Sequence, residues 1–262
     1  MMSPSAIPDT LPDDAEREAL VGDWPLWQRR RGHRTSTDDV VTAARAASLV
    51  PGAARYLDIG CGVGSVMLLV AHALRPGRTV GVEAQGQSVA LLRRTLGELP
   101  DPPPIEVIHG DLREVDPAAL GRFDLITGSP PYFPLGTGVL PPDPQRQACR
   151  FELRGGVEDY AAAAGRLLAD DGVFVMVAQT ALAARVERGT HAASLAIRSR
   201  LDLWMREDRT DPFLTVFELR RTPGECVTTT LAVRTAAGAV SDGYAALRAV
   251  VGLATHASDR PG

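Results

Sequence analysis

A short run of polar and proline residues follows an apolar segment and offers acceptors for a weakly nucleophilic amine. Residues 123–127 are followed, after one glycine, by Ser129, Pro130, Pro131 and Tyr132. Prolines fix φ and lack an N–H, so this loop presents carbonyl oxygens. An amine conjugated to an aromatic ring attacks poorly unless acceptors engage its hydrogens. These four residues form the predicted catalytic loop, with the Ser129 hydroxyl and the Pro130 carbonyl as acceptors and Tyr132 as a stacking surface.

A glycine-rich turn earlier in the chain forms a second candidate site. The short apolar segment 55–59 runs into alternating glycines, where the backbone can turn sharply and approach a ligand closely. Position 65 is serine, whereas the dinucleotide-binding fingerprint needs glycine there. The predicted members of this site are Asp58, Gly60, Cys61, Gly62 and Gly64.

Two further acids end the next two predicted strands. Glu83 ends residues 79–83, and an acid in this position can accept hydrogen bonds from ribose hydroxyls. Asp111 follows residues 105–109 and can hold an adenine amino group. Because the carboxyl ends of parallel strands face one crevice, we expect these acids beside the glycine turn. The predicted site also includes their neighbours, Ala84 and Leu112.

The order of predicted elements indicates an α/β fold. Strands are predicted at 55–59, 79–83, 105–109, 123–127, 172–178, 201–205 and 213–219, and helices at 40–49, 63–74, 87–99, 157–168 and 180–199. This alternation predicts a mostly parallel seven-stranded sheet with helices on both faces. A strand at 227–233 and a helix at 243–251 follow.

These elements suggest one domain preceded by an arm. Residues 1–23 are rich in proline and acids and are predicted to be a flexible, loosely attached arm. Residues 24–262 are predicted to form a single domain. Within it, 24–50 are a basic segment and helix, 51–220 the core, and 221–262 a C-terminal addition.

Composition narrows the function classes. The net charge is −4, and all 28 basic residues are arginine. The three cysteines and five histidines do not cluster, so no metal is predicted. No apolar run approaches the ~18 residues of a membrane span, and the start is unlike a secretory signal. We therefore expect a cytoplasmic protein without a membrane partner.

With these motifs in place, the chain resembles bacterial tRNA adenine-N6 methyltransferases that modify a valine tRNA beside its anticodon. The resemblance spans residues ~24–251 and rests on the glycine turn, the strand-end acids and three further segments: 34–38, 145–150 and 240–247. It implies a Rossmann-like class I methyltransferase fold with S-adenosylmethionine as cofactor. It also implies that Thr37 lines the methionine end of that cofactor.

One residue departs from the family pattern. The family usually carries Asn where this chain has Ser129, and serine presents a shorter acceptor. Serine occurs at this position in some amino-methyltransferases, especially those acting on cytosine N4. The departure concerns the identity of the substrate base more than the class of reaction.

Arginines near the catalytic loop suggest an RNA partner. Loop 128–156 is long, and long ordered loops are usually functional. Its arginines, with those at 29–34, are predicted to form a phosphate-binding rim, although solvated surface arginines explain them equally well. The predicted substrate-binding residues are Arg30, Arg34, Phe133, Arg146 and Arg150. We expect tRNA as partner and no stable protein partner.

Three other functions fit parts of this pattern. A protein glutamine N5-methyltransferase shares the two motifs but usually has a distinct N-terminal helical domain, for which ~50 residues leave little room. A small-molecule N-methyltransferase agrees with the acidic net charge. A non-enzymatic binding module that has lost catalysis would explain Ser129, but the retained Pro130, Pro131 and Tyr132 argue against it.

Overall fold

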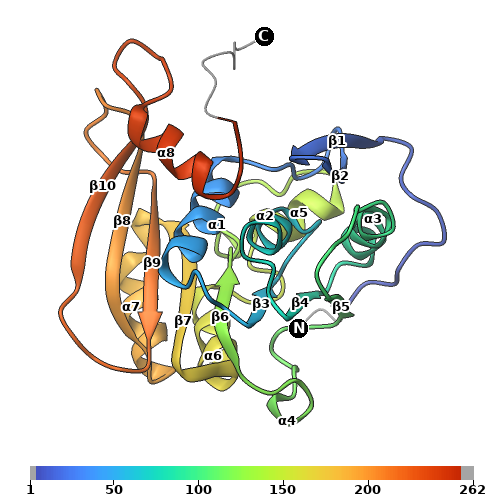
Figure 1. Cartoon of the computed structure of the whole chain (residues 1–262), viewed down its shortest axis with the longest axis horizontal. Coiled ribbons are helices and arrows are strands. Elements are labelled where there is room, and N and C mark those ends of the chain that lie inside the picture. Colours follow the sequence, from blue (N-terminus) through green and yellow to red (C-terminus); the bar gives the residue numbers. More distant parts are fainter. Residues whose placement is uncertain (1–3, 255–262) are drawn as a thin grey trace.

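The computed structural model describes residues 4–254, and its centre is one large sheet (Figure 1). Its strands are β3 (Arg55–Ile59), β4 (Arg78–Glu83), β5 (Ile105–His109), β6 (Phe123–Gly128), β7 (Leu168–Gln179), β8 (Ala196–Arg206), β9 (Leu214–Arg220) and β10 (Val227–Arg234). Their spatial order is β10-β8-β9-β7-β6-β3-β4-β5. The strands from β7 to β5 are parallel, whereas β9 runs antiparallel to β7 and β8.

The predicted mostly parallel α/β sheet is confirmed, but the predicted strand number of seven is wrong for the described residues. The eighth strand is β10, which pairs in parallel with β8 at the edge of the sheet, whereas the sequence places this segment outside the core. Local alternation indicates a strand, but it does not reveal which sheet edge the strand will join.

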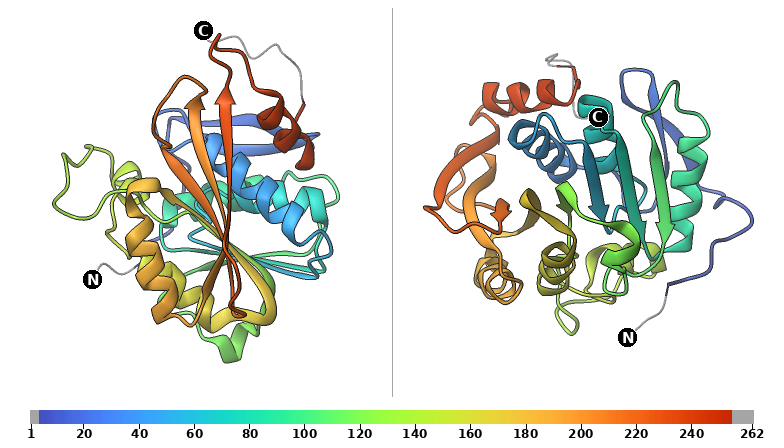
Figure 2. Two further views of the ribbon diagram at one scale, coloured as in Figure 1. Left: turned by 90° about the vertical axis from the view of Figure 1, so that its left-hand side faces the viewer. Right: turned by 60° about the horizontal axis from the view of Figure 1, so that its bottom comes forward.

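Helices cover both faces of the sheet (Figure 2). On one face lie α1 (Thr37–Leu49), α2 (Ser65–Leu74), α3 (Gly86–Leu96) and α8 (Asp242–Val250). On the other lie α4 (Pro117–Leu120), α6 (Val157–Leu167) and α7 (Ala183–Ala192), which follows the short 3-10 turn η1 (Thr180–Leu182). A further helix, α5 (Pro144–Arg150), lies in the long loop after β6.

Successive residues of the central strands pack into two separate hydrophobic cores, one on each face of the sheet. Tyr56 of β3 belongs to the core under α1 and α2, and Leu57 belongs to the core under α6. Leu125 and Ile126 of β6 divide in the same way. Because both faces are covered, the middle residues of these strands are apolar on both sides, as Tyr56-Leu57 and Leu125-Ile126 show.

The predicted loose arm at residues 1–23 is wrong for most of its length. Strands β1 (Ala15–Val21) and β2 (Trp24–Arg29) form an antiparallel hairpin. The Trp24 ring meets His72 of α2 edge-on at 5.1 Å, and the backbone N–H of Trp27 donates to Thr95 Oγ1 of α3 at 2.9 Å. Upstream, the Ser5 N–H donates to the Ala84 carbonyl at 3.0 Å. Residues 1–3 and 255–262 of the predicted domains lie outside the described residues.

The predicted helix 180–199 is also wrong beyond residue 192. Ser194 takes a positive φ of 56°, and Ala196 already begins β8. The alanine-rich composition favours a helix, but pairing of β8 with β9 prevails. No helix among the described residues is long and apolar enough to cross a membrane.

Candidate active site

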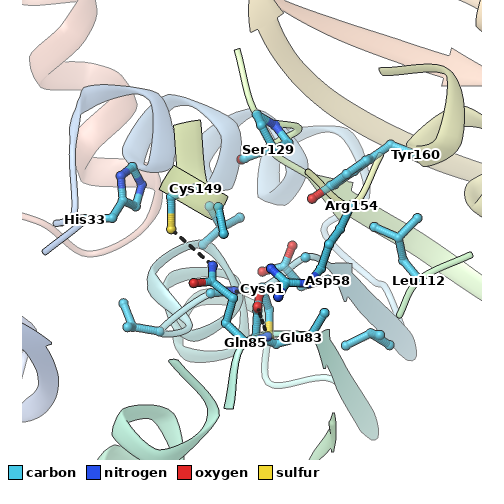
Figure 3. Close-up of a pocket in the computed structure, with 18 of the residues that line it drawn as sticks. His33, Asp58, Cys61, Glu83, Gln85, Leu112, Ser129, Cys149, Arg154 and Tyr160 are labelled. Atoms are coloured by element: carbon cyan, nitrogen blue, oxygen red, sulfur yellow. Dashed lines mark hydrogen bonds between the residues drawn. The ribbon is translucent and has the colours of Figure 1, made fainter. Parts of the chain in front are cut away.

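A pocket opens at the carboxyl ends of β3, β4, β5 and β6 (Figure 3). About 890 Å³ of empty space lies within and in front of the pocket, open solvent included. The predicted residues that line it are Asp58, Gly60, Cys61, Gly62, Glu83, Ala84, Asp111, Leu112, Ser129 and Pro131.

The glycine turn forms one wall of this pocket. Gly60 has a φ of +69°, and a Cβ there would lie 2.1 Å from the hydroxyl oxygen of Tyr160. Gly62 also has a positive φ, of +58°, but faces open space. Gly64 instead packs against Leu92, so its role is structural. The turn therefore keeps backbone exposed to a ligand on one side and packs tightly on the other.

Asp58 is buried beneath the turn and is held by a hydrogen-bond chain. Thr127 Oγ1 donates to Asp58 Oδ1 at 2.7 Å, and the Tyr56 hydroxyl lies 2.7 Å from the same threonine oxygen. Burial raises the Asp58 pKa to about 7, with Thr127 opposing the shift and the Glu83 charge adding to it. A cation in the pocket would relieve this cost of ionisation.

Glu83 links the ends of β3 and β4. Its two carboxylate oxygens accept from the N–H groups of Gly62 at 2.9 Å and Gln85 at 2.6 Å. Burial raises its pKa, and those two N–H groups oppose the shift. The carboxylate keeps further lone pairs for ligand hydroxyls. Cys61, in the same wall, has its pKa raised mainly by burial and is not an activated nucleophile.

Asp111 is fixed by its own loop. Both oxygens accept from the Arg113 side chain, at 2.8 Å and 2.5 Å. Burial alone would raise its pKa, but these bonds hold the pKa below its usual value. Asp111 is therefore an ionised acceptor at neutral pH, and Leu112 beside it supplies an apolar surface.

Ser129 occupies the wall opposite the glycine turn. Its Oγ is buried and has no hydrogen-bond partner among the described residues. Pro131 also lines the pocket, whereas Pro130 is buried outside the lining. The loop after β6 therefore directs one unsatisfied hydroxyl at the space between itself and the acids.

The stacking role predicted for Tyr132 does not match its position. Its hydroxyl donates to Asp38 Oδ2 of α1 at 2.5 Å, and the ring packs against the core, outside the pocket lining. Tyr132 instead ties the loop after β6 to the beginning of α1. Phe133 also lies outside the pocket, against the ring of Phe151 at 5.5 Å.

Thr37, which the resemblance places at the methionine end of the cofactor, does not line the pocket. Asp39, and not Thr37, lines the pocket. Its Oδ2 accepts from the Ser36 N–H at 3.1 Å, and its pKa is raised well above the usual value by burial and then by Asp38. The sequence does not indicate that Asp39 could contact a ligand, because an acid three residues after a serine is already explained by its role in capping the helix.

Several lining residues were not predicted for the pocket, among them His33, Gln85, Cys149 and Tyr160, and Arg154 lines it although it was predicted as part of the phosphate-binding rim (Figure 3). They come from irregular segments, from α5 and from α6, which the chain brings to the pocket over long separations. Tyr160 shows the difficulty, because its hydroxyl meets Gly60 across one hundred residues of chain.

The predicted substrate arginines divide into two groups. Arg34 forms ion pairs with Glu16 and Glu18 of β1 and so belongs to the hairpin. Arg30, Arg146 and Arg150 are exposed, and none pairs with a carboxylate within residues 4–254. Arg150 lies over the Phe133 ring at 5.3 Å.

The pocket fits a cationic nucleoside cofactor. Its buried acids come from four elements and favour a positively charged ligand, while Leu112 and Ala84 offer an apolar surface for a flat ring. The described residues contain no cluster of three or more potential metal ligands.

Comparison with known proteins identifies the class. Residues 57–135 match a family model described as a methyltransferase domain. A predicted O-methyltransferase from Agrobacterium tumefaciens has a TM-score of 0.59 at 18% identity, covering 85% of this chain and 99% of its own. A putative RNA methyltransferase from Pyrococcus horikoshii has a TM-score of 0.52 at 17% identity, covering 74% and 89%. The chain is a SAM-dependent methyltransferase with a Rossmann-like fold.

Sequence relatives are more specific, and they confirm the resemblance found in the sequence. A tRNA1(Val) (adenine(37)-N6)-methyltransferase from Citrobacter koseri is 28% identical over 215 residues, which is 82% of this chain and 86% of the relative. A protein of the same name from Bacteroides thetaiotaomicron is 30% identical over 163 residues, or 62% and 66%.

Proposed function

We propose that this protein transfers a methyl group from S-adenosylmethionine to the N6 amine of an adenine in tRNA. The observation that carries the proposal is the unpartnered Ser129 Oγ in the wall of the cofactor pocket. A buried hydroxyl without a partner costs free energy, and an amine N–H of the substrate supplies the missing bond. The names of the relatives support adenine and tRNA as the target.

The residues of the pocket divide the work. Bound S-adenosylmethionine would supply an electrophilic methyl group on a positively charged sulfur, and S-adenosylhomocysteine and a proton lost from the amine would be the other products. Asp58 and Asp39 would attract the positive charge, Glu83 would accept from the ribose hydroxyls, and Asp111 would accept from the adenine amino group. Ser129 Oγ and the Pro130 carbonyl accept from the two amine hydrogens of the target, so that charge developing on its nitrogen is offset.

The exposed arginines support an RNA substrate. Arg29 of β2 pairs with Asp143 beside α5 at 2.6 Å, and Gly32 lies against Gln145 of α5. These contacts join the hairpin end to α5, so that Arg30 and Arg146 belong to one exposed basic rim near the pocket. Such a rim fits a phosphate backbone.

Labelled cofactor and total RNA provide the direct test. Incubation followed by nucleoside analysis is expected to yield N6-methyladenosine in the tRNA fraction, with the label lost on RNase treatment. Ser129→Ala is the matched control, because it removes the proposed acceptor and leaves the acids in place. Label in N4-methylcytosine, in protein or in small molecules would replace the proposed substrate and leave the methyltransferase class intact.

Two conditions accompany the proposal. Methyl transfer needs no metal in this mechanism, so a chelator is expected to leave the rate unchanged. A tRNA substrate also places the enzyme in the cytoplasm. Fractionation of cells producing the protein tests that location.

A further inference from the structure

An exposed apolar loop projects beside the active site. We call residues 134–142 the apical loop. Its Leu135, Val139 and Leu140 are 59%, 92% and 46% exposed. They make up half of the large hydrophobic residues that are exposed within residues 4–254. Exposing such side chains costs free energy unless a partner covers them.

The base of this loop is firmly closed. The Phe133 N–H donates to the Arg150 carbonyl at 2.9 Å, and the Glu152 N–H donates to the Phe133 carbonyl at 3.0 Å. The rings of Phe133 and Phe151 pack at 5.5 Å. The apical loop therefore starts from a base that is held in place by hydrogen bonds and ring packing.

The residues that flank the apical loop on both sides line the pocket. Pro131 lines the pocket just before the loop, and Ala148 and Cys149 of α5 line it just after. Figure 2 shows the loop extending away from the body of the protein. The apical loop thus stands beside the mouth of the pocket.

The tip is shaped locally and not by packing. Gly136 and Gly138 have φ values of +86° and +87°, and nothing lies within 4 Å of a Cβ at either position. The Thr137 N–H donates to the Pro134 carbonyl at 3.1 Å and closes a turn. The apolar side chains are therefore held outward without a partner from the described part of this chain.

The charge around the loop selects the kind of partner. The return limb carries the exposed Arg146 and Arg150, whose charges both act on His33 at the pocket. An apolar tip next to cations fits the stacked bases and phosphates of a nucleic acid, because bases are apolar on their faces and flanked by negative charge.

Burial of Ser129 adds a geometric requirement. The N6 amine of a stacked adenine cannot reach a hydroxyl within the pocket, so the base must leave its stack. Proteins that open a base step commonly insert Leu, Ile, Met or Phe into the gap.

We propose that the apical loop is a wedge that enters the RNA base stack and occupies the gap left when the target base moves into the pocket. This inference rests on the proposed function. Leu135, Val139 and Leu140 supply the inserted surface, while Arg146 and Arg150 hold the flanking phosphates.

The test uses a tRNA transcript in which 2-aminopurine replaces the methylated adenine, because its fluorescence rises on unstacking. The variant is Leu135→Ser/Val139→Ser/Leu140→Ser, and the control is Val227→Ser, another exposed valine, on β10. The wedge variant is expected to keep its cofactor affinity and thermal midpoint and to bind RNA within about threefold of wild type. It should lose the fluorescence rise and methylate normal tRNA at least about tenfold more slowly.

Other outcomes overturn the proposal in recognisable ways. Unchanged fluorescence and rate in the wedge variant would show that the loop does not open the stack. Lost RNA binding with intact cofactor binding would make the loop a docking contact. If the wild type binds cofactor but neither binds nor methylates RNA, the proposed function itself fails, and a protein partner for the loop becomes the better explanation.

Discussion

The two walls of the pocket are built in opposite ways. On the side of the glycine turn, every acid is buried and hydrogen-bonded: Asp58 by Thr127, Glu83 by two backbone N–H groups, and Asp111 by Arg113. On the side of the loop after β6, the Ser129 hydroxyl has no partner within the described residues, and apolar side chains face solvent. One wall is complete without a ligand, whereas the other lacks its partners.

This difference assigns the two walls to different ligands. A small cofactor enters a preformed site that recognises it through fixed acceptors. A large polymer must supply the hydrogen bonds and the apolar cover that the other wall lacks. Each variant below changes one wall and leaves the other intact.

The largest effect is expected at Gly60. Gly60→Ala places a Cβ 2.1 Å from Tyr160 Oη at a φ of +69°. We expect the free energy of unfolding to fall by at least about 2 kcal/mol and cofactor binding to be lost. Gly138→Ala is the matched control, because its φ is +87° but its surroundings are empty, and it should cost about 1 kcal/mol or less. Chemical denaturation and calorimetry measure both, and normal cofactor binding by the Gly60 variant would contradict the packed wall.

Ser129 should give the second largest effect, confined to the rate. Ser129→Ala removes an acceptor whose bond strengthens as the amine gains charge, so single turnover should slow by about 2–3 kcal/mol, or roughly a hundredfold. Cofactor affinity should not change. Ser129→Asn should keep or raise activity on adenine, since it restores the residue usual in the family that the chain resembles. Equal rates for the wild type and both Ser129 variants would show that the loop after β6 is only a structural turn.

The two walls also differ in how far the sequence predicts them. The acids at 58, 83 and 111 follow from one rule, that parallel strands end at a common edge, and all three line the pocket. The stacking predicted for Tyr132 is wrong, because its hydroxyl binds Asp38 instead. That contact could not be foreseen, since Asp38 lies 94 residues away in the sequence. Asp39 and Tyr160 escape prediction for the same reason. Local patterns predict strand ends, but they do not predict which distant side chain will satisfy a loop.

The fold shows the same limit at its edges. The central strands from β3 to β7 are predicted closely, because apolar runs covered on both faces are distinctive. The N-terminal hairpin escapes prediction, since its buried Trp24 and Leu26 are hidden among charged residues. The pairing of β10 with β8 depends on the whole sheet and has no local signal.

A moderate effect is expected from the arginines of α5. Arg146→Ala/Arg150→Ala should weaken RNA binding and lower the salt dependence of log K by about 2, because each arginine is expected to neutralise one phosphate. Cofactor affinity should stay the same. Arg209→Ala, an exposed arginine of the β8–β9 turn, is the control. If the salt dependence of RNA binding is unchanged in the double variant, these two arginines do not contact the RNA.

The smallest effect, at most about tenfold per pH unit, concerns Asp58. Its pKa of about 7 lies above the usual 3.8, so the folded protein binds this proton more tightly than the unfolded chain. The ligand-free protein should therefore lose stability as the pH rises from about 4 to about 7. Binding of the cationic cofactor favours the ionised form and releases the proton, so affinity should rise toward pH 7 and level off above it. Calorimetry in two buffers of different ionisation enthalpy measures the proton released. Asp58→Asn should bind weakly with a reduced pH dependence, whereas an unchanged profile would assign the titration to Asp39 or Glu83, whose pKa values are also raised by burial.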